Sequence, residues 1–384
     1  MKKLSCAFVT HYPMPDLRAF SGVSYFLSRH LERAGIDVQY VHATPPTYTS
    51  LSFRLRRKFY KKVFGWGMRE DREPWVMKRA ARELDEKLKN LKFDFIFSPG
   101  SLAVSYLQNN KPKFFWSDAT FAGYIDFAPE FTNMSPETIY KGNRLEQNSI
   151  DNCAAVFYCS DWAAQTALNY YKASPDKVKV ISFGANFDEV PDQETFQRII
   201  ENKFFKQCRL VFYGGEWERK GGSLVLRVVE ELVRRGTKVS LDIIGCNPLI
   251  PDKLRDCIIA HGFISKKTKE GSDKISSLLQ QSHFLILPAQ QDASALAFCE
   301  AAAFGVPGLG SRVGGSSTII RDGVNGQLFQ VGVDPGVICD YIQTIFSNVS
   351  AYLDLARRTR GEFETRLNWT SSVAAFLEQI KKYI

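Results

Sequence analysis

The stretch HFLILPAQQDASALAFCEAAAFGVPGLG, from His283 to Gly310, carries the clearest fold information in this chain. Its first apolar run, His283–Leu287, has the length and composition of a buried strand. The alanine-rich segment Ser294–Phe304 follows as a helix, and Gly308–Gly310 is a second short strand. A strand, a helix and another strand in this order predict a βαβ unit in a parallel sheet.

The same alternation of apolar strands and amphipathic helices runs through the rest of the chain. The further expected strands are Leu4–Thr10, Val38–His42, Phe93–Ser98, Lys113–Trp116, Ala155–Cys159, Val178–Phe183, Arg209–Tyr213, Val239–Gly245 and Cys257–Gly262. The further expected helices are Gly22–Ala34, Val76–Leu91, Pro136–Cys153, Ala163–Tyr171, Gly222–Arg235, Ser272–Gln281, Pro335–Phe346 and the tail Trp369–Ile384. This pattern predicts an α/β protein with two doubly wound, Rossmann-like domains that meet near the polar segment 184–194.

The composition indicates the cellular compartment and excludes several classes of protein. The chain has 384 residues, a net charge of +9 and eight scattered cysteines without any Cys-x-x-Cys pair. This spacing argues against a disulfide framework and against a zinc site, and it favours a reducing, cytoplasmic compartment. The first apolar run is too short for a signal peptide, and no stretch approaches the ~20 apolar residues of a membrane span.

Two glycine-rich loops follow expected strands, where ligands of doubly wound sheets bind. In FYGGEWERKGG, residues 212–222, two glycine pairs flank Arg219 and Lys220 just before a helix, which suits a diphosphate. Ser21 and Gly22 open the first helix in the same way. The alternatives are a solvated loop for the first segment and a simple helix cap for the second.

The opening stretch holds two carboxylates around a loop of small side chains. Ser294, Ala295 and Leu296 leave backbone N–H groups accessible to a phosphate or a sugar hydroxyl. Glu300 lies among apolar residues, where a carboxylate needs a partner, and it suits the vicinal hydroxyls of a ribose. Asp292 could hold the hydroxyls of a sugar. In the alternative interpretation, Asp292 is an N-cap and Glu300 is a surface acid.

The second half of the chain carries a family resemblance. The segments E-A-x-A-x-G-x-P from Glu300, G-G at 314–315 and D-G-x-N-G at 322–326 resemble the signature of the retaining, GT-B-fold glycosyltransferases of group 1. Sucrose synthases and phosphatidylinositol mannosyltransferases belong to this family. The resemblance implies an acceptor-side domain over 1–188, a donor-binding domain over 189–365, and a C-terminal helix, 366–384, that returns to the first domain.

The resemblance also assigns roles to residues. It implies donor binding by Ser21, Gly22, Gly215, Arg219, Lys220, Gly262, Phe263, Ile264, Ser294, Ala295, Leu296 and Glu300. Three positions depart from the family. Gly215 stands where an arginine is usual, so we expect Arg219 to substitute, and Ser117 stands where many members have a histidine. Asp292 stands where the family has a glutamate that contacts the donor sugar. The expected catalytic residues are Asp118, Lys220 and Asp292. The mechanism that the family implies uses no metal and no cofactor beyond the nucleotide-sugar.

A basic stretch, FRLRRKFYKKVFGW at 53–66, holds six of the basic residues and no acid. On a helical wheel its rings and aliphatic side chains share one half, broken by Arg56, which is typical of a helix that binds an anionic membrane surface. The candidate contacts are Arg54, Arg57, Lys58, Phe59, Lys61, Lys62 and Trp66. The alternative is a core-packed helix with a solvated basic face. No nucleic-acid-binding motif accompanies the stretch.

Together these features predict a glycosyltransferase that moves a sugar from a nucleotide diphosphate, UDP by family frequency, to a hydroxyl of a glycan, lipid or small molecule. It would be cytoplasmic, and peripheral on the inner face of the plasma membrane if the basic stretch binds lipid. Two alternatives stay open at this point. One is a nucleotide-sugar epimerase. The other is a non-catalytic, membrane-associated binding module in which Gly215, Ser117 and Asp292 mark lost activity.

Overall fold

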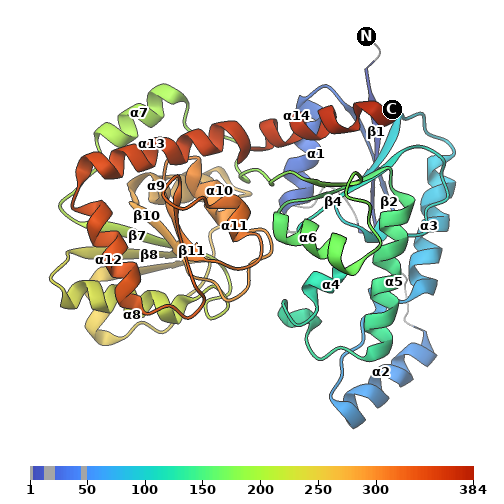
Figure 1. Cartoon of the computed structure of the whole chain (residues 1–384), viewed down its shortest axis with the longest axis horizontal. Coiled ribbons are helices and arrows are strands. Elements are labelled where there is room, and N and C mark those ends of the chain that lie inside the picture. Colours follow the sequence, from blue (N-terminus) through green and yellow to red (C-terminus); the bar gives the residue numbers. More distant parts are fainter. Residues whose placement is uncertain (1–2, 13–21, 45–49) are drawn as a thin grey trace. The chain divides into compact units, whose positions relative to one another are not determined.

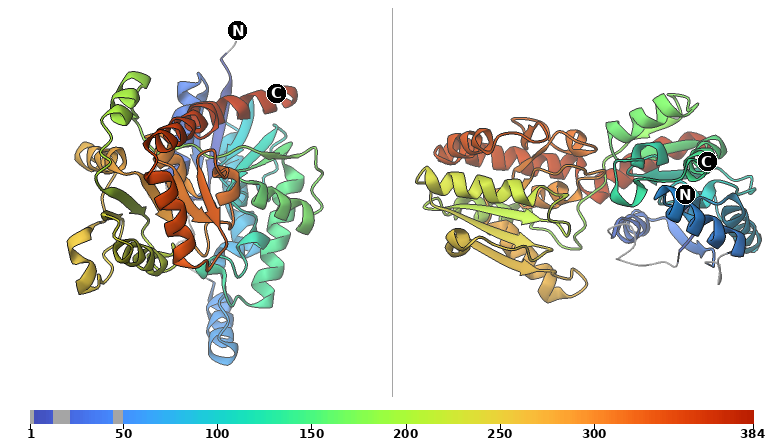
Figure 2. Two further views of the ribbon diagram at one scale, coloured as in Figure 1. Left: turned by 60° about the vertical axis from the view of Figure 1, so that its left-hand side comes forward. Right: turned by 90° about the horizontal axis from the view of Figure 1, so that it is seen from below.

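The chain folds as two α/β units, each with its own parallel sheet (Figure 1). The computed structural model describes residues 3–12, 22–44 and 50–384. Contacts divide the chain into unit 1, Met1–Ile181 with Val373–Ile384, and unit 2, Ser182–Ser372. Helices cover both faces of each sheet, as Figure 2 shows from two further sides. The expected doubly wound α/β fold is confirmed.

Unit 1 contains a six-stranded parallel sheet in the order β2-β1-β3-β4-β5-β6. Its strands are β1 Ser5–Thr10, β2 Asp37–His42, β3 Phe95–Ser98, β4 Lys113–Ser117, β5 Ala155–Tyr158 and β6 Val178–Val180. The strand order reverses between β1 and β3, so their carboxyl ends form the switch point at which such sheets bind ligands.

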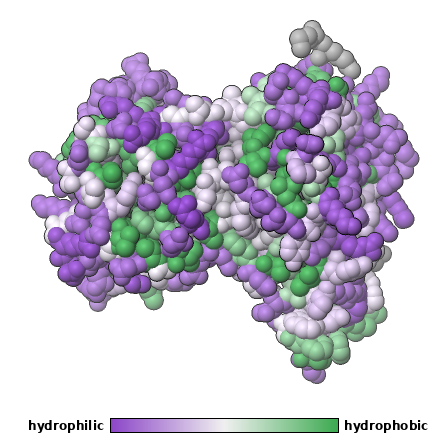
Figure 3. All heavy atoms as spheres, viewed as in Figure 1, coloured by the Kyte–Doolittle hydropathy of each residue, from purple (hydrophilic) through white to green (hydrophobic). Residues whose placement is uncertain are grey.

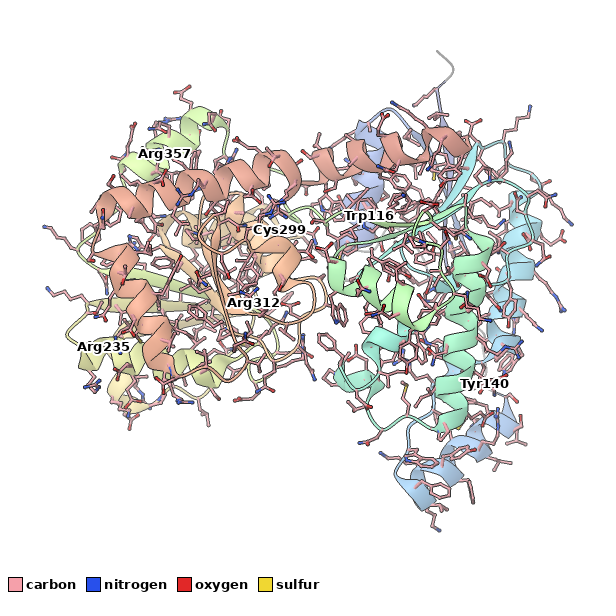
Figure 4. The ribbon with its side chains drawn as sticks, in the orientation of Figure 1. Trp116, Tyr140, Arg235, Cys299, Arg312 and Arg357 are labelled. Atoms are coloured by element: carbon pink, nitrogen blue, oxygen red, sulfur yellow. The ribbon has the colours of Figure 1, made fainter. Side chains whose placement is uncertain are left out.

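Helices and short 3₁₀ turns complete unit 1. The elements are α1 Val23–Arg33, α2 Leu51–Phe64, η2 Glu70–Arg72, α3 Pro74–Leu88, η3 Leu102–Val104, α4 Phe121–Tyr124, η4 Pro129–Phe131, α5 Pro136–Asn152 and α6 Asp161–Tyr170. The final helix, α14 Trp369–Ile380, passes from unit 2 into unit 1 and leads into η6 Lys381–Tyr383. There Phe376 packs against rings from three strands, including Phe97 at 5.1 Å and Phe157 at 4.8 Å between centroids. Trp116, labelled in Figure 4, stacks on the same ring. The C-terminal part of α14 therefore packs on the sheet of unit 1.

Unit 2 repeats the plan with the strand order β12-β11-β10-β7-β8-β9. Its strands are β7 Cys208–Tyr213, β8 Val239–Ile244, β9 Ile258–Gly262, β10 Phe284–Leu287, β11 Gly308–Ser311 and β12 Gly326–Phe329. Its helical elements are α7 Gln193–Glu201, α8 Gly222–Arg234, η5 Asp252–Cys257, α9 Lys269–Gln281, α10 Leu296–Ala302, α11 Ser316–Ile319, α12 Pro335–Phe346 and α13 Val349–Arg366. The switch point here lies between β7 and β10.

Several elements differ from the sequence-based expectation, and β12, α13 and α10 are among them. The sequence pattern does not predict β12 or α13, and the start expected for α10 is two residues too early. β12 has only four residues and begins with Gly326, so it becomes a strand by pairing along β11. The long helix α13 is highly charged, and its apolar positions, such as Leu355 and Phe363, form a narrow stripe against the core of unit 2.

Candidate functional site

The switch point of unit 2 joins a lysine and an aspartate from two neighbouring loops. Lys220 follows β7, and its Nζ donates to Oδ2 of Asp292, which follows β10, over 2.7 Å. Their side chains are 16% and 6% exposed. An ion pair this close and this shielded from water is held strongly, because water screens it poorly. The two expected catalytic residues of unit 2 are thus brought together.

Gly221 allows the two loops to approach each other. Its φ is 82°, a left-handed conformation, and a Cβ atom there would lie 2.1 Å from the carbonyl oxygen of Pro288. Only glycine tolerates both conditions. Arg219 ties the loops together as well, because its Nη1 donates to the backbone oxygen of Gln291 over 2.7 Å. Arg219 also pairs with Glu216, so it is committed to protein groups on both sides.

Asp292 also shapes the start of α10. Its Oδ1 accepts a hydrogen bond from the N–H of Ala295 over 3.0 Å, and Ala295 has a left-handed φ of 49°. The helix begins only at Leu296. The expectation that Ser294 and Ala295 lie in the first helical turn is therefore wrong. Asp292 holds the Ala295 N–H, which leaves Leu296 as the first helical residue that could face a ligand.

Glu300 is buried on α10 and has the partner that its position demands. Its side chain is 5% exposed, and its Oε1 accepts from Nζ of Lys266 over 2.5 Å. Burial, together with the nearby Glu300 carboxylate, raises the pKa of Tyr213 well above its ordinary value. Cys299, labelled in Figure 4, precedes Glu300 and directs its thiol to the carbonyl of Phe183. The alternative of a surface acid is wrong for Glu300.

Sequence reasoning missed Lys266 and Tyr213 as members of this site. Lys266 lies in the loop after β9, and its Nζ is 5.3 Å from the ring centroid of Phe187 and 5.7 Å from that of Tyr213. The sequence does indicate that Glu300 needs a partner, because its neighbours in the chain are apolar. The pattern could not name that partner because 34 residues separate the two.

The other residues expected to contact the donor lie at a strand end, a helix start or a loop of their unit. Those that the structure describes have no polar side chain. Gly262 has a φ of 64°, and a Cβ atom there would lie 3.0 Å from the Asn247 amide. Phe263 is 83% exposed, and Ile264 packs partly against the core. A Cβ atom at Gly215 would lie 3.9 Å from the carbonyl oxygen of Gly245, which is an ordinary contact. Gly22 begins α1 with a φ of 83°, and Ser21 lies outside the described residues. Their ligand contacts stay predictions.

The switch point of unit 1 contains a cavity of 270 Å³. Residues after β1, β3 and β4 line it, and Asp118 is among them with 8% exposure. The hydroxyl of Tyr124 donates to Oδ1 of Asp118 over 2.5 Å. Burial, and to a smaller extent the Asp118 carboxylate, raises the pKa of Tyr124 well above its ordinary value. Ser117 donates its hydroxyl to the oxygen of Ala119 instead.

Further ionisable groups, which are not among the expected site residues, line the same cavity. Burial raises the pKa of Glu146, on α5, to about 7, although the hydroxyl of Ser101 donates to its Oε2 over 2.6 Å. Burial lowers the pKa of His11, at the end of β1, to about 4. Arg72 lies with its guanidinium 4.6 Å from the Phe121 ring centroid. The cavity therefore combines acidic, basic and aromatic groups.

The basic stretch forms α2, which extends from the body of unit 1 (Figure 1). Its buried side chain is Phe53, and Arg56 on the same side pairs with Glu73 and Glu137. Five large apolar side chains are 49–69% exposed: Leu51, Leu55, Phe59, Val63 and Phe64. Figure 3 shows this hydrophobic surface at the tip of unit 1. The alternative of a core-packed helix is therefore wrong.

The candidate membrane contacts all lie on or next to this surface. Arg54, Arg57, Lys58, Phe59, Lys61 and Lys62 are exposed, and Trp66 is half-buried. Trp66 stacks on Phe64 with ring centroids 4.5 Å apart. Among the described residues, every helix is too short or too polar to cross a bilayer.

Two Rossmann-like units with a polar site at each switch point define the GT-B class of α/β proteins. Residues 207–348 match the family Glycosyl transferases group 1, and residues 23–189 match Glycosyltransferase Family 4. The chain belongs to the GT-B glycosyltransferases of group 1, which confirms the resemblance.

Known proteins of this class are similar over different lengths. The D-inositol 3-phosphate glycosyltransferase of Corynebacterium efficiens is 22% identical over 216 residues, which are 53% of this chain and 50% of that protein. The match thus spans half the length of this curated relative. Sucrose-phosphate synthase from Thermosynechococcus elongatus has a TM-score of 0.69 at 14% identity, with 99% of this chain and 98% of that chain covered. Anabaena HepE, solved in complex with UDP-glucose, has a TM-score of 0.63 at 12% identity, with 99% and 100% covered. At these identities the solved structures show the shared fold.

Proposed function

We propose that this protein transfers a sugar from a nucleotide diphosphate sugar to an acceptor hydroxyl and retains the anomeric configuration. The observation that carries this proposal is the contact of Lys220 with Asp292 at the switch point of unit 2. A cation and a carboxylate at this edge suit the two halves of such a donor, because the diphosphate needs positive charge and the sugar needs hydrogen-bond acceptors.

In the proposed reaction, the diphosphate leaves the sugar with growing negative charge. Lys220 exchanges Asp292 for a phosphate oxygen, and Arg219 and the N–H of Leu296 add positive potential at the same place. Asp292, released from Lys220, accepts hydrogen bonds from the donor sugar. The acceptor hydroxyl attacks from the face that the diphosphate leaves, without a protein nucleophile, as the family implies. Its proton passes to the departing phosphate oxygen as the bond between the sugar and the diphosphate breaks. Since Lys220 contacts the diphosphate and Arg219 adds positive potential beside it, this scheme uses no metal ion.

Glu300 would hold the ribose of the donor. A buried carboxylate has several lone pairs, so beside its contacts with Lys266 and Tyr213 it can accept from the two vicinal hydroxyls. We take UDP as the carrier, which is in keeping with the UDP-glucose complex of Anabaena HepE. Gly262, Phe263 and Ile264 would then contact the base.

The transfer proposal is tested by incubating the full chain with UDP-sugars and a panel of glycan and lipid acceptors. Transfer in the wild type and its loss in Lys220→Ala and Glu300→Gln are expected. Wild-type turnover in both variants would overturn the site assignment. A change of the sugar without any acceptor would instead indicate an epimerase.

We further propose that α2 docks the protein on an anionic membrane surface, so that the acceptor is membrane-linked. The exposed apolar side chains would enter the headgroup region, and the lysines and arginines beside them would contact anionic lipid. Co-sedimentation with vesicles of phosphatidylglycerol and phosphatidylcholine at low salt tests this. The protein should bind these vesicles and should not bind pure phosphatidylcholine. Absence of sedimentation with the anionic vesicles would refute membrane docking.

A further inference from the structure

The cavity of unit 1 carries unmet hydrogen-bonding capacity on buried side chains. Nε of Arg72 and Oε1 of Glu146 are buried and form no hydrogen bond of normal geometry among the described residues. Arg72 is 7% exposed and Glu146 is 2% exposed. Such groups are rare in native proteins unless a ligand or water completes them. A hydroxyl group donates and accepts, so hydroxyls of one ligand can complete both.

The charges that line the cavity leave no surplus cation for a phosphate. Arg69 is taken by Asp71 through two contacts, Nε to Oδ1 at 3.0 Å and Nη2 to Oδ2 at 2.8 Å. The lowered pKa of His11 keeps its ring uncharged at neutral pH. Arg72 also lies near Asp71, with Nε 3.9 Å from Oδ2, and the carboxyl groups of Glu146 and Asp118 lie on the same lining. An incoming phosphate would meet more acidic than basic side chains, whereas neutral hydroxyls can pair with both.

Aromatic rings complete a lining that suits a sugar. Phe121 and Tyr124 both border the cavity. Rings of this kind pack against the C–H face of a sugar while carboxylates and a guanidinium take its rim of hydroxyls.

A second cavity of 290 Å³ adjoins the first, because His11 and Asp71 line both. Its lining includes four apolar side chains: Ala43, Val76, Met77 and Ala80. A ligand that fills the polar cavity with a sugar can therefore extend an apolar group into the second one.

Resting on the transfer reaction proposed above, we infer that these two cavities bind the acceptor, and that the acceptor is an uncharged glycoside with an apolar aglycone. This differs in chemistry from the phosphorylated polyol after which the curated relatives are named. Glu146 and Arg72 are the specificity-determining residues for the sugar, and Val76 and Met77 are those for the aglycone.

The test measures binding of matched probes to the full chain in saturating UDP by isothermal titration calorimetry. For glucose, galactose and mannose, the octyl glycoside, the methyl glycoside and the 6-phosphate are compared. We expect at least one octyl glycoside to bind about tenfold or more tightly than its 6-phosphate, which is what one hydrogen bond to a charged group contributes. The methyl glycoside should fall between them.

Variants link the binding to the cavity. Glu146→Gln should weaken the octyl glycoside severalfold, whereas Glu86→Gln, at an exposed position of α3, should leave it unchanged. Tyr124→Phe keeps the ring and removes only the hydroxyl that donates to Asp118. This second variant should also weaken binding of the octyl glycoside, and it serves as the test if Glu146→Gln does not fold. Melting temperatures establish folding.

Three results would overturn the inference: a 6-phosphate that binds as tightly as its octyl glycoside, no saturable binding of any neutral glycoside, or unchanged binding in both cavity variants. UDP binding in the same samples separates this inference from the transfer proposal. If the wild type does not bind UDP, the transfer proposal is refuted. If it binds UDP but prefers the 6-phosphates to the octyl glycosides, only the proposed acceptor class is refuted.

Discussion

Nζ of Lys220 lies 2.7 Å from Oδ2 of Asp292, although 72 residues separate them in the chain. The parallel pairing of β7 with β10 produces this contact, because the loops that follow neighbouring strands leave the same edge of the sheet. A diphosphate that enters the site must therefore compete with Asp292 for the lysine.

Replacing Lys220 by alanine should weaken binding of UDP by about tenfold or more, because a hydrogen bond to a charged group contributes about 1.5–3 kcal/mol. Calorimetric titration with UDP measures this loss. Lys269→Ala is the matched control, since Lys269 is 82% exposed and forms a surface ion pair with Asp273. Equal affinities in wild type and Lys220→Ala would remove Lys220 from the donor site.

The variant Glu300→Gln should weaken binding of UDP and leave binding of pyrophosphate unchanged, because the proposed partner of Glu300 is the ribose. Lys266→Ala should act in the same direction, since it removes the group that orients Glu300. Competition titrations with both ligands separate the two effects. A parallel loss for pyrophosphate would place Glu300 near the phosphates instead.

On α2, the change Phe59→Glu should abolish sedimentation with anionic vesicles, because a carboxylate is repelled by the lipid and no longer buries apolar area. Phe59 is 57% exposed, so the melting temperature should stay close to that of the wild type. Leu249→Glu is the control, as Leu249 is 96% exposed in unit 2. Vesicle binding that resists Phe59→Glu would argue for another lipid-binding surface.

Glu146 should make the stability of the protein depend on pH. Its pKa is raised from 4.5 to about 7 by burial, so between these values the folded state keeps a proton that the unfolded chain releases. The stabilisation is present below pH 4.5 and is lost as the pH rises to 7, by about 3 kcal/mol in total.

Urea unfolding of wild type and Glu146→Gln at pH 5 and pH 8 measures this effect. The variant cannot titrate at this position, so its free energy of unfolding should gain on that of the wild type as the pH rises. The titration of His11, which acts in the opposite direction, is common to both proteins and cancels. A constant difference between the two proteins would contradict a buried, protonated Glu146.

Gly221→Ala should destabilise unit 2 more than Gly236→Ala does. Both glycines have a positive φ, 82° and 79°, so both substitutions carry the left-handed strain of about 1–2 kcal/mol. At Gly221 the new Cβ atom would also lie 2.1 Å from the oxygen of Pro288, whereas at Gly236 it meets no atom within 4 Å. Thermal unfolding of the two variants gives the comparison, and equal losses would mean that the two loops can move apart.

The chain's pattern alone was enough for most of the architecture. Apolar runs such as His283–Leu287 and Arg209–Tyr213 are buried on both faces of their sheet, so their composition marks them as strands without any partner in view. The short strand β12 escaped notice because four residues that begin with glycine carry too little periodicity, and it exists through its pairing with β11.

For single polar residues too, the sequence indicates that a partner is needed, and the tertiary structure decides which residue it is. The apolar surroundings of Glu300 in the sequence demanded a partner, but the partner is Lys266, from a different loop, and long-range folding selects it. Likewise, Arg56 looked like a break in the apolar side of α2, and it is an anchor to Glu73 and Glu137. The cavity of unit 1 was invisible because its groups come from distant segments that meet only at the carboxyl ends of the strands. Local periodicity thus specifies strands and helices, since neighbours in the chain create it, whereas ion pairs and cavities depend on which strands become neighbours in the sheet.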